Sequence, residues 1–413
     1  MLTRKDIEIM SPVGSFASLR AAIQGGANSI YFGVEKMNMR SRSSGNFSLE
    51  DLNEIVNIAG KHGINTYLTV NIVVYDDEKE RIGEIINKAK EAGVTAIIAS
   101  DMAVILQAME AGMPVHASTQ LNISNFDALK FYASFADVVL LARELHLEQV
   151  KKIYDKVIKE KITGPSGEMI KLELFAHGAL CMSISGKCYL SLHEYNASAN
   201  RGACYQVCRR GYTVTDKETN RQLDIDNEYL MSPKDLCTIH FLDKILDAGI
   251  RVLKIEGRAR SPEYVKTVTE CYGEAVQAII NGDYTQENIR KWREKLSTVF
   301  NRGFWDGYYL GQKLGEWSKV YGSKATKRKI YVAKGKKYFD NIRVGEFTTE
   351  SGSLAIGDEY LITGPSTGVI EGKVEEIRVD DKMVPQTTSG ENFSMPVERK
   401  IRASDKLYKI VVR

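Results

Sequence analysis

Three observations predict an α/β fold, in which a TIM-type (β/α)8-like barrel with a cysteine-rich insertion is followed by a small C-terminal all-β barrel domain. Short β-branched runs alternate with longer helical patterns through most of the chain, which is typical of parallel strands joined by crossover helices. About eight such repeats over roughly 300 residues suit a closed barrel better than an open doubly wound sheet. After residue 312 the helical patterns stop and only short alternating runs remain.

The barrel strands are expected at residues 7–13, 29–34, 65–71, 96–100, 115–119, 137–141, 172–177 and 252–257. Amphipathic segments lie between them, including 16–25, 49–62, 78–92 and 102–111. Several of these segments end in Ala-Gly or Gly-Gly, dipeptides that close a helix before the next strand. The first strand leads into Ser-Pro-Val-Gly-Ser-Phe rather than Gly-x-Gly-x-x-Gly, so nothing here predicts a dinucleotide cradle.

The pattern predicts three parts: a barrel at 1–311 with a cysteine-rich segment at 178–237, a linker at 312–328, and a small β-barrel domain at 329–413. The linker contains glycine, serine and lysine. Strands of the second domain are expected at 329–333, 341–346, 359–362, 370–377 and 407–412. Gly-Asp and Gly-Pro-Ser-Thr-Gly turns separate them.

Composition favours a cytoplasmic enzyme. With 413 residues, of which 43% are hydrophobic and 26% charged, the chain can bury one large core and a second small one. The first residues contain no apolar run of signal-peptide length, and no segment reaches the length of a membrane span. The net charge of +3 is too near neutral to predict nucleic-acid binding by the whole surface. Any contact with RNA must therefore come from a local patch.

Five of the six cysteines lie between residues 173 and 237. The first four form a C-x6-C pair and a C-x3-C pair, Cys181 with Cys188 and Cys204 with Cys208. Because cytosolic disulfides are rare, such a cluster is typical of thiolates around a metal or an iron–sulfur cluster. Zinc sites usually use closer pairs, which the first pair fits poorly. The alternative is that these are small buried hydrophobic residues, and Cys271, inside a helical pattern, is interpreted as core.

The same segment resembles a known family signature. It reads Glu173-x-Phe175-x-x-Gly178-Ala179-Leu180-Cys181 and then Gly186-x-Cys188-x-Leu190-Ser191. These residues are similar at every fixed position to the signature of the collagenase-like peptidase U32 family. Further landmarks of that family lie at 11–33, 232–237, 253–258 and 300–304, so the resemblance covers roughly the whole chain. Within the family, the chain is most similar to the RNA-hydroxylating branch, in particular the prephenate-dependent tRNA uridine hydroxylation proteins.

This resemblance implies an iron–sulfur-dependent enzyme that hydroxylates a tRNA wobble uridine, with a prephenate-type carboxylate as cosubstrate. Four thiolates are the usual complement of a 4Fe-4S cluster. The expected ligands are Cys181, Cys188 and Cys204, with Cys237 or Cys208 as the fourth. Cys237 is preferred because adjacent branches of the family place a late cysteine there.

In a barrel, the carboxyl ends of the strands form the active face. Polar residues expected there are Glu35, Asn71, Gln120, Asn122, Arg143, Glu144, His177 and residues 254–258. The catalytic residues are unknown, with Glu173, His177 and Glu256 as candidates. His177 is compatible with a metal ligand, a proton donor or a partner of Glu173, although the family signature leaves its position free.

Two pairs of arginines are candidates for binding the carboxylate, since a guanidinium matches a carboxylate with two hydrogen bonds. Arg40 and Arg42 follow the second strand, and Arg40 stands in an Asn38-x-Arg40 stretch that is a landmark of the resembling family. Arg258 and Arg260 follow the last strand, and Arg40 and Arg258 are the preferred member of each pair. Asn38 is included with them as a binding residue. Ordinary solvated arginines and loop-capping polar residues are the alternative interpretation.

The entry to the second domain is basic and aromatic. It contains Lys324, Lys327, Arg328, Lys329, Lys334, Lys336 and Lys337 together with Tyr331, Tyr338 and Phe339. Lysines that neutralise phosphates beside rings that stack on bases predict contact with tRNA or another structured RNA. A solubilising edge on an accessory domain is the alternative.

Two other functional classes remain open. The first is a protease, although the sequence contains no H-E-x-x-H motif, and its G-x-S-x-G stretch at residues 364–368 is the turn expected between two strands of the second domain, not a strand-to-helix nucleophile elbow. The second is a noncatalytic iron–sulfur scaffold protein. The sequence leaves the oligomeric state open.

Overall fold

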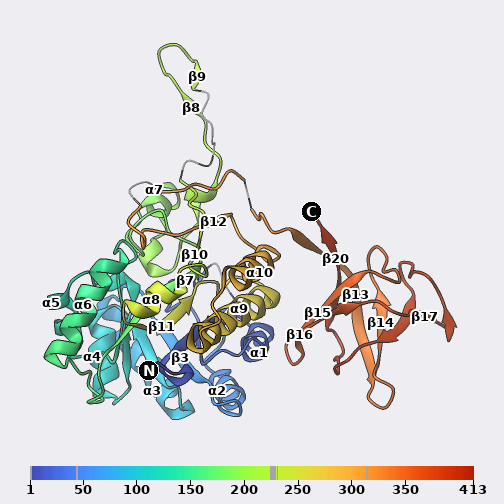
Figure 1. Ribbon diagram of the computed structural model, residues 1–413, viewed down its shortest axis with the longest axis horizontal. Helices are drawn as coiled ribbons and strands as arrows, with labels where there is room; N and C mark the ends of the chain where they lie inside the picture. Colours follow the sequence, from blue (N-terminus) through green and yellow to red (C-terminus); the bar gives the residue numbers. More distant parts are fainter. Residues whose placement is uncertain (1, 43–44, 224–228, 230, 313–314, 321) are drawn as a thin grey trace.

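The computed structural model describes residues 2–42, 45–223, 229, 231–312, 315–320 and 322–413. A barrel of strands surrounded by helices lies beside a smaller β-sheet body (Figure 1). No described helix combines the length and the apolar character needed to cross a bilayer.

Eight parallel strands form the closed barrel. Their order follows the chain from β1 to β7, and β11 closes the ring by pairing with both β7 and β1. The strands are β1 (Glu8–Pro12), β2 (Ser29–Phe32), β3 (Asn65–Val70), β4 (Ala96–Ala99), β5 (Val115–Ala117), β6 (Val138–Leu140), β7 (Lys171–Gly178) and β11 (Ile250–Ile255). All eight predicted barrel strands are confirmed, because each observed end lies within two residues of the expected one.

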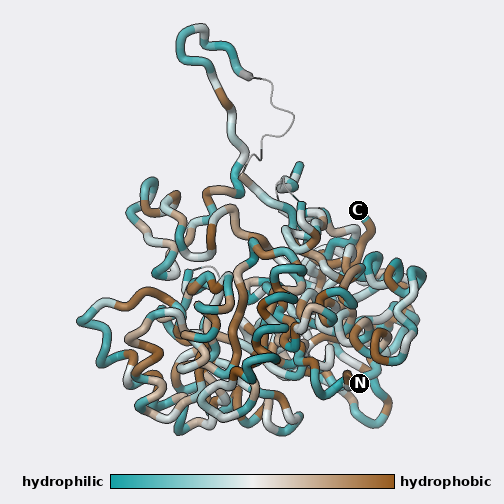
Figure 2. The backbone as a smooth tube through the Cα atoms, turned by 60° about the vertical axis from the view of Figure 1, so that its left-hand side comes forward, coloured by the Kyte–Doolittle hydropathy of each residue, from teal (hydrophilic) through white to brown (hydrophobic). Residues whose placement is uncertain are grey.

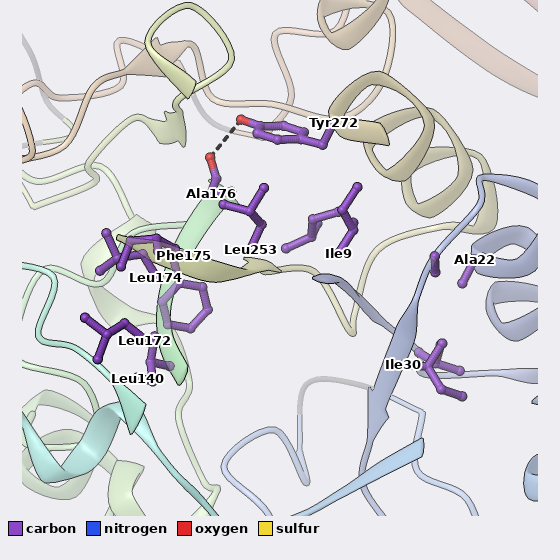
Figure 3. Packing of buried hydrophobic residues seen from close by; sticks show 14 of the residues in the cluster. Ile9, Ala22, Ile30, Leu140, Leu172, Leu174, Phe175, Ala176, Leu253 and Tyr272 are labelled. Atoms are coloured by element: carbon purple, nitrogen blue, oxygen red, sulfur yellow. Dashed lines mark hydrogen bonds between the residues drawn. The ribbon is translucent and has the colours of Figure 1, made fainter. Parts of the chain in front are cut away.

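Helices cover the outside of the barrel (Figure 1). They are α1 (Phe16–Gln24), α2 (Leu52–Gly60), α3 (Lys79–Ala92), α4 (Met102–Glu110), α5 (Phe126–Tyr132), α6 (Leu147–Glu160), α8 (Leu242–Asp247), α9 (Pro262–Asn281) and α10 (Gln286–Ser297). The main hydrophobic core lies between these helices and the strands. Figure 3 shows part of it, where Tyr272 Oη of α9 donates to the Ala176 carbonyl of β7 at 2.8 Å. Cys271 of α9 is fully buried in this core, as predicted.

The cysteine-rich segment forms a cap over the carboxyl ends of the strands. It contains α7 (Leu190–Tyr195) and the hairpin of β8 (Val214–Thr215) and β9 (Gln222–Leu223). The hairpin belongs to a largely hydrophilic arm that projects from the body (Figure 2). Arg201 anchors the cap by two 2.6 Å hydrogen bonds to the Glu78 carboxylate. The cap ends in β10 (Asp235–Cys237), which runs antiparallel to β7 and pairs with β12 (Phe304–Trp305).

The C-terminal body is an antiparallel sheet curved into a half-barrel, which confirms the predicted all-β class. Its strands are β13 (Lys327–Phe339), β14 (Val344–Thr349), β15 (Glu359–Gly364), β16 (Gly368–Lys373), β17 (Arg378–Val379), β18 (Lys382–Met383), β19 (Asn392–Pro396) and β20 (Lys406–Val412). Phe347 and Phe393 stack in its core at 5.4 Å between ring centroids. Residues 313, 314 and 321 of the predicted linker lie outside the described residues.

The sheet is docked on the barrel through α1 and α9. Gln24 of α1 donates to the Thr367 carbonyl at 3.0 Å and accepts from the Val369 amide at 2.9 Å. Lys266 of α9 pairs with Glu371 at 2.7 Å. Val369 is itself part of the main barrel core. These contacts hold the sheet against the side of the barrel, away from the cap (Figure 1).

Candidate functional site

A pocket lies between the carboxyl ends of the barrel strands and the cap, and we call it the barrel pocket. It holds about 970 Å³ of space free of atoms, part of which is open to solvent. Its floor comes from the strands and its roof from the cap. Floor residues include Tyr31, Thr69, Ile98, Leu140, Phe175 and Lys254.

Four cysteines line the roof: Cys181, Cys188, Cys204 and Cys208. Burial raises the pKa of the Cys208 thiol to about 11, and the other three thiols act in the same direction. Among the described residues, no three His, Cys, Asp or Glu side chains already converge as a metal site. Four thiols around one pocket are nevertheless the donor set that a cubane cluster requires. The residues present therefore fit an iron–sulfur cluster.

Cys237, which the sequence favoured as the fourth ligand, lies apart from these four cysteines. It belongs to β10, is 1% exposed and pairs in register with His177 rather than facing the barrel pocket. Burial in the main core raises the pKa of its thiol to about 11. Its proximity in sequence to the last strand does not bring it to the pocket, because β10 folds back against β7. Cys208 lines the pocket wall together with Cys181, Cys188 and Cys204.

Arg40 and Glu256 form an ion pair at the edge of the pocket. Arg40 donates to Glu256 Oε1 through Nε at 3.1 Å and through Nη2 at 2.7 Å. Burial alone would raise the pKa of Glu256, but the charges of Arg40, Arg143 and Arg258 outweigh burial and lower it to about 2. Glu256 is therefore ionised at neutral pH. Much of the hydrogen-bonding capacity of Arg40 is already used by this carboxylate.

Arg258 is a buried support rather than an open binding group. Its guanidinium donates to Thr69 Oγ1 at 2.9 Å and to Asn38 Oδ1 at 2.8 Å. Asn38 is completely buried, and its Oδ1 also accepts from the backbone amide of Arg40 at 3.1 Å. A Cβ at Gly33 would lie 2.4 Å from Arg258 Nη1, so glycine is required there for the arginine to pass. Asn38 and Arg258 together hold the loop that carries Arg40.

A second ion pair lies deeper, between Glu173 of β7 and Lys254 of β11. Lys254 Nζ lies 2.8 Å from Glu173 Oε1, and the two side chains are 6% and 1% exposed. Burial raises the pKa of Glu173, while Lys254 opposes that shift. Lys254 Nζ also lies 4.8 Å from the ring centroid of Tyr31. Because Lys254 lines the pocket and Glu173 does not, the lysine is the member of the pair that can meet a ligand.

His177 faces the core and not the pocket. Strand alternation from Glu173 and Phe175 would point His177 inward, but a register shift between Phe175 and His177 reverses its direction. Its ring packs against Tyr264, Tyr272 and Phe304 with centroids 5.6 to 6.0 Å away. Burial lowers its pKa to about 3, so the ring is neutral. Its position therefore gives it no access to a ligand in the barrel pocket.

Arg143 was expected only as one of several polar residues on the active face, yet it has the open geometry of a binding group. It lines the pocket, and its guanidinium stacks 3.8 Å from the ring centroid of Phe175. Nη1 donates to the Ala179 carbonyl at 3.2 Å, whereas the buried Nε has no partner in the described chain. The sequence gives no reason to prefer Arg143 over Arg40 as the ligand-binding arginine. Only the contacts in the folded chain distinguish the two.

The basic entry to the C-terminal sheet is partly neutralised. Lys327 pairs with Glu359, Lys329 with Glu263 and Lys336 with Glu346, at 2.5, 2.8 and 3.0 Å. Tyr331 donates its hydroxyl to Glu350. Within the described ranges, four of the predicted cations have no carboxylate partner: Lys324, Arg328, Lys334 and Lys337.

Two buried histidines are expected to make the folded protein less stable in acid. His177 and His116 both have pKa values lowered to about 3 by burial, against about 6.5 in an unfolded chain. Between these values the unfolded chain binds more protons, so stability falls as pH decreases through this window. We expect His177→Gln to flatten the dependence of unfolding free energy on pH by about 1.4 kcal/mol per pH unit.

Urea titrations between about pH 4 and pH 6 measure this slope. His62→Gln, at an exposed position, controls for the substitution itself. A slope in His177→Gln equal to that of the unmodified protein would contradict a buried neutral His177.

Comparison with known proteins places this chain in a family. The sequence model of peptidase family U32 matches residues 14–319. The chain is 59% identical over 404 residues to a collagenase of Porphyromonas gingivalis, covering 98% of both chains. It is 32% identical over 332 residues to a tRNA hydroxylation protein of Bacillus subtilis, covering 77% of this chain and 76% of that protein.

A third relative is a 23S rRNA 5-hydroxycytidine synthase of Escherichia coli. It is 34% identical over 318 residues, which cover 75% of this chain and 46% of that enzyme. The relatives therefore include proteins named for collagen cleavage and proteins named for RNA hydroxylation. The extent of the family match shows that the chain belongs to peptidase family U32.

Proposed function

We propose that this protein is an iron–sulfur-dependent RNA hydroxylase that acts on a tRNA wobble uridine and uses a prephenate-type carboxylate as cosubstrate. The observation that carries the proposal is the set of four cysteines on the wall of a cationic barrel pocket. Relatives named for tRNA and rRNA hydroxylation support the choice of RNA as substrate. The wobble position and prephenate come from the resemblance of the sequence alone.

Cys181, Cys188, Cys204 and Cys208 would hold the cluster. When bound, such a cluster supplies one-electron chemistry whose potential depends on nearby charges and hydrogen bonds. Three of these cysteines also border a second cavity that contains Arg40, Arg209, Arg260 and Arg302. The chain thus places arginines beside these three thiols, where their charges would offset the negative charge of a thiolate-bound cluster.

Arg143 is the residue best placed to bind the small carboxylate. Arg40 already binds Glu256, and Arg258 is fixed by Thr69 and Asn38. Stacking on Phe175 orients the Arg143 guanidinium while its Nε keeps an unused donor. Lys254 adds a second positive charge to the floor. A carboxylate over this floor would meet both cations without breaking the Arg40–Glu256 pair.

The cysteine assignment predicts a clear division among the six thiols. Replacing Cys181, Cys188, Cys204 or Cys208 by Ser should abolish the absorbance near about 400 nm that a cubane gives, because each removes one of four ligands. Cys237→Ser and Cys271→Ser are matched controls outside the pocket and should retain it. Iron analysis of anaerobically purified protein provides the second measurement. Stoichiometric zinc without iron, or loss of the signal only in Cys237→Ser, would contradict the assignment.

The role of Arg143 is tested with Arg143→Lys, which keeps the charge but loses the planar fork. We expect prephenate affinity, measured by calorimetry, to fall about tenfold or more, since a charge-assisted hydrogen bond contributes roughly 1.5–3 kcal/mol. Arg251→Lys is the matched control, because Arg251 also lies over an aromatic ring, Tyr154, but outside the pocket. Arg40→Lys should have a smaller effect. Equal affinities for all three variants would remove Arg143 from the site.

The function itself is tested in cells. Deleting the gene and any paralogue should remove hydroxylated wobble uridine from digested tRNA, as measured by mass spectrometry. A truncation before Lys324 tests the C-terminal sheet separately, because the cysteines lie in the barrel part. We expect that truncated, folded protein to keep its cluster absorbance but lose hydroxylation. Unchanged hydroxyuridine in the deletion strain would refute the function, and unchanged levels with the truncation would refute a role for the sheet.

Collagen cleavage is the second candidate function, because the relative with 59% identity bears that name. The described barrel pocket presents no histidine that could activate a nucleophile, since its lining contains none. Incubating the purified holoprotein with collagen decides between the two. Cleavage that persists after Cys204→Ser would favour a protease independent of the cluster. A noncatalytic iron–sulfur scaffold remains if neither reaction is found.

A further inference from the structure

A further cleft, distinct from the barrel pocket and from the cavity beside it, opens on the outer side of the cap, and we call it the outer cleft. It holds about 1080 Å³ of space free of atoms and lies between the cap and residues near Gly322. Four arginines and one tyrosine dominate its lining: Arg42, Arg209, Arg210, Arg302 and Tyr205. None of these residues lines the barrel pocket.

The outer cleft adjoins the barrel pocket through shared residues. Cys204 and Gln206 line both, and they also line the small cavity between them. Arg209 and Arg302 extend from the outer cleft into that intermediate cavity. A polymer held in the outer cleft could therefore present one of its groups to the barrel pocket beside the thiols.

Positive charge exceeds negative charge along this path. Asp235, which is 1% exposed, faces two arginines, Arg302 at 3.3 Å and Arg260 at 3.8 Å. Arg209 donates to neutral groups, the Ser232 hydroxyl at 3.1 Å and the Pro233 carbonyl at 2.6 Å. One carboxylate thus compensates three buried or half-buried guanidinium groups in the described part of this wall.

An aromatic stack displays two further guanidinium groups at the surface. Arg42 lies 3.7 Å from the centroid of the Tyr205 ring, and Tyr205 stacks on Tyr195 at 4.5 Å with 18° between the planes. Arg210 closes the other end, 5.3 Å from Tyr195 and paired with Glu194 at 3.1 Å. Arg42 is exposed and has no carboxylate partner among the described residues. Stacking fixes its plane while leaving its N–H edge open to a phosphate.

We infer that the outer cleft binds backbone phosphates of the RNA strand whose target nucleotide enters the barrel pocket. The inference rests on the proposed function and adds the docking surface. Because these arginines are spread along a path, they fit the successive phosphates of a strand. A single small anion would be bound better by arginines that converge on one point. Phosphate contacts fix the register of a nucleic acid without reading its sequence. The basic entry of the C-terminal sheet is the weaker candidate, because three of its lysines are already paired.

The experiment measures binding of an unmodified tRNA transcript to the full-length, iron-loaded protein by fluorescence anisotropy over a salt series. Arg42→Ala should weaken binding several-fold. The negative slope of log K against log salt should become shallower by about one, because one phosphate contact is lost. Arg42→Lys should retain most of that slope, since the charge remains. Lys152→Ala, on α6 at the outside of the barrel, is the control for an exposed cation. Iron content should be unchanged in all variants, because none of the replaced residues is a cysteine ligand.

Each outcome has a distinct meaning. The wild type could bind tRNA while Arg42→Ala and Arg210→Ala keep the same affinity and salt slope. That result would overturn RNA binding by the outer cleft and leave the proposed function standing. No binding of RNA by the wild type, or hydroxyuridine that persists in the deletion strain, would overturn both. Displacement of tRNA by inorganic phosphate as effectively as by an RNA oligonucleotide of equal phosphate content would make the cleft a site for free anions and overturn RNA docking.

Discussion

The parallel pairing of β7 with β11 is the contact on which the barrel and its pocket both depend. These strands are separated along the chain by the entire cap, so their pairing closes the ring. The buried Lys254–Glu173 ion pair crosses this seam at 2.8 Å. Removing one member alone would leave an uncompensated buried charge, at a cost of about 3–5 kcal/mol.

The ends of the same two strands shape the pocket. β7 passes into the cap at Gly178, whose φ of 108° and 2.3 Å approach of a Cβ to the Glu256 carbonyl exclude a larger residue. β11 continues into Glu256 and Arg258, which hold the Arg40 loop. The cap and the charged edge are therefore positioned by one seam. Strand closure and site geometry cannot vary independently here.

The barrel could be predicted from the sequence because its strands are short runs of buried residues, each followed by the pattern of an amphipathic helix. The sequence was insufficient for β10 and β12, of three and two residues, since such short segments have no periodicity to detect. It also missed β17, β18 and β19 in the sheet. The shift at Ala176 is a further example: nothing in the strand pattern marks the irregularity that turns His177 into the core.

For the site, cysteine spacing identified the segment but not the geometry within it. Cys208 and Cys237 were both compatible with a fourth ligand, and only the antiparallel return of β10 separates them. Arg40 was predicted as a charge, but its partner Glu256 lies 216 positions away in the chain. Residue type indicated where cations would gather. Tertiary contacts determine which of them remains open to a ligand.

Charge balance then constrains what the barrel pocket can hold. Its lining contains four cations, Arg40, Arg143, Lys254 and Arg258, and one carboxylate, Glu256. Glu173, which lies outside the pocket lining, pairs with Lys254. With Glu256 and Glu173 subtracted from the four cations, two positive charges remain. Four cysteine thiolates with a cubane, or a dicarboxylate metabolite, would each supply negative charge of that order. Both together would exceed it, and the arginines of the adjoining cavity, Arg209, Arg260 and Arg302, would supply the remainder after Asp235 compensates one of their three charges. If the pocket holds a cluster and an anionic ligand side by side, as proposed, the arginine-rich wall behind the thiols would balance their charge.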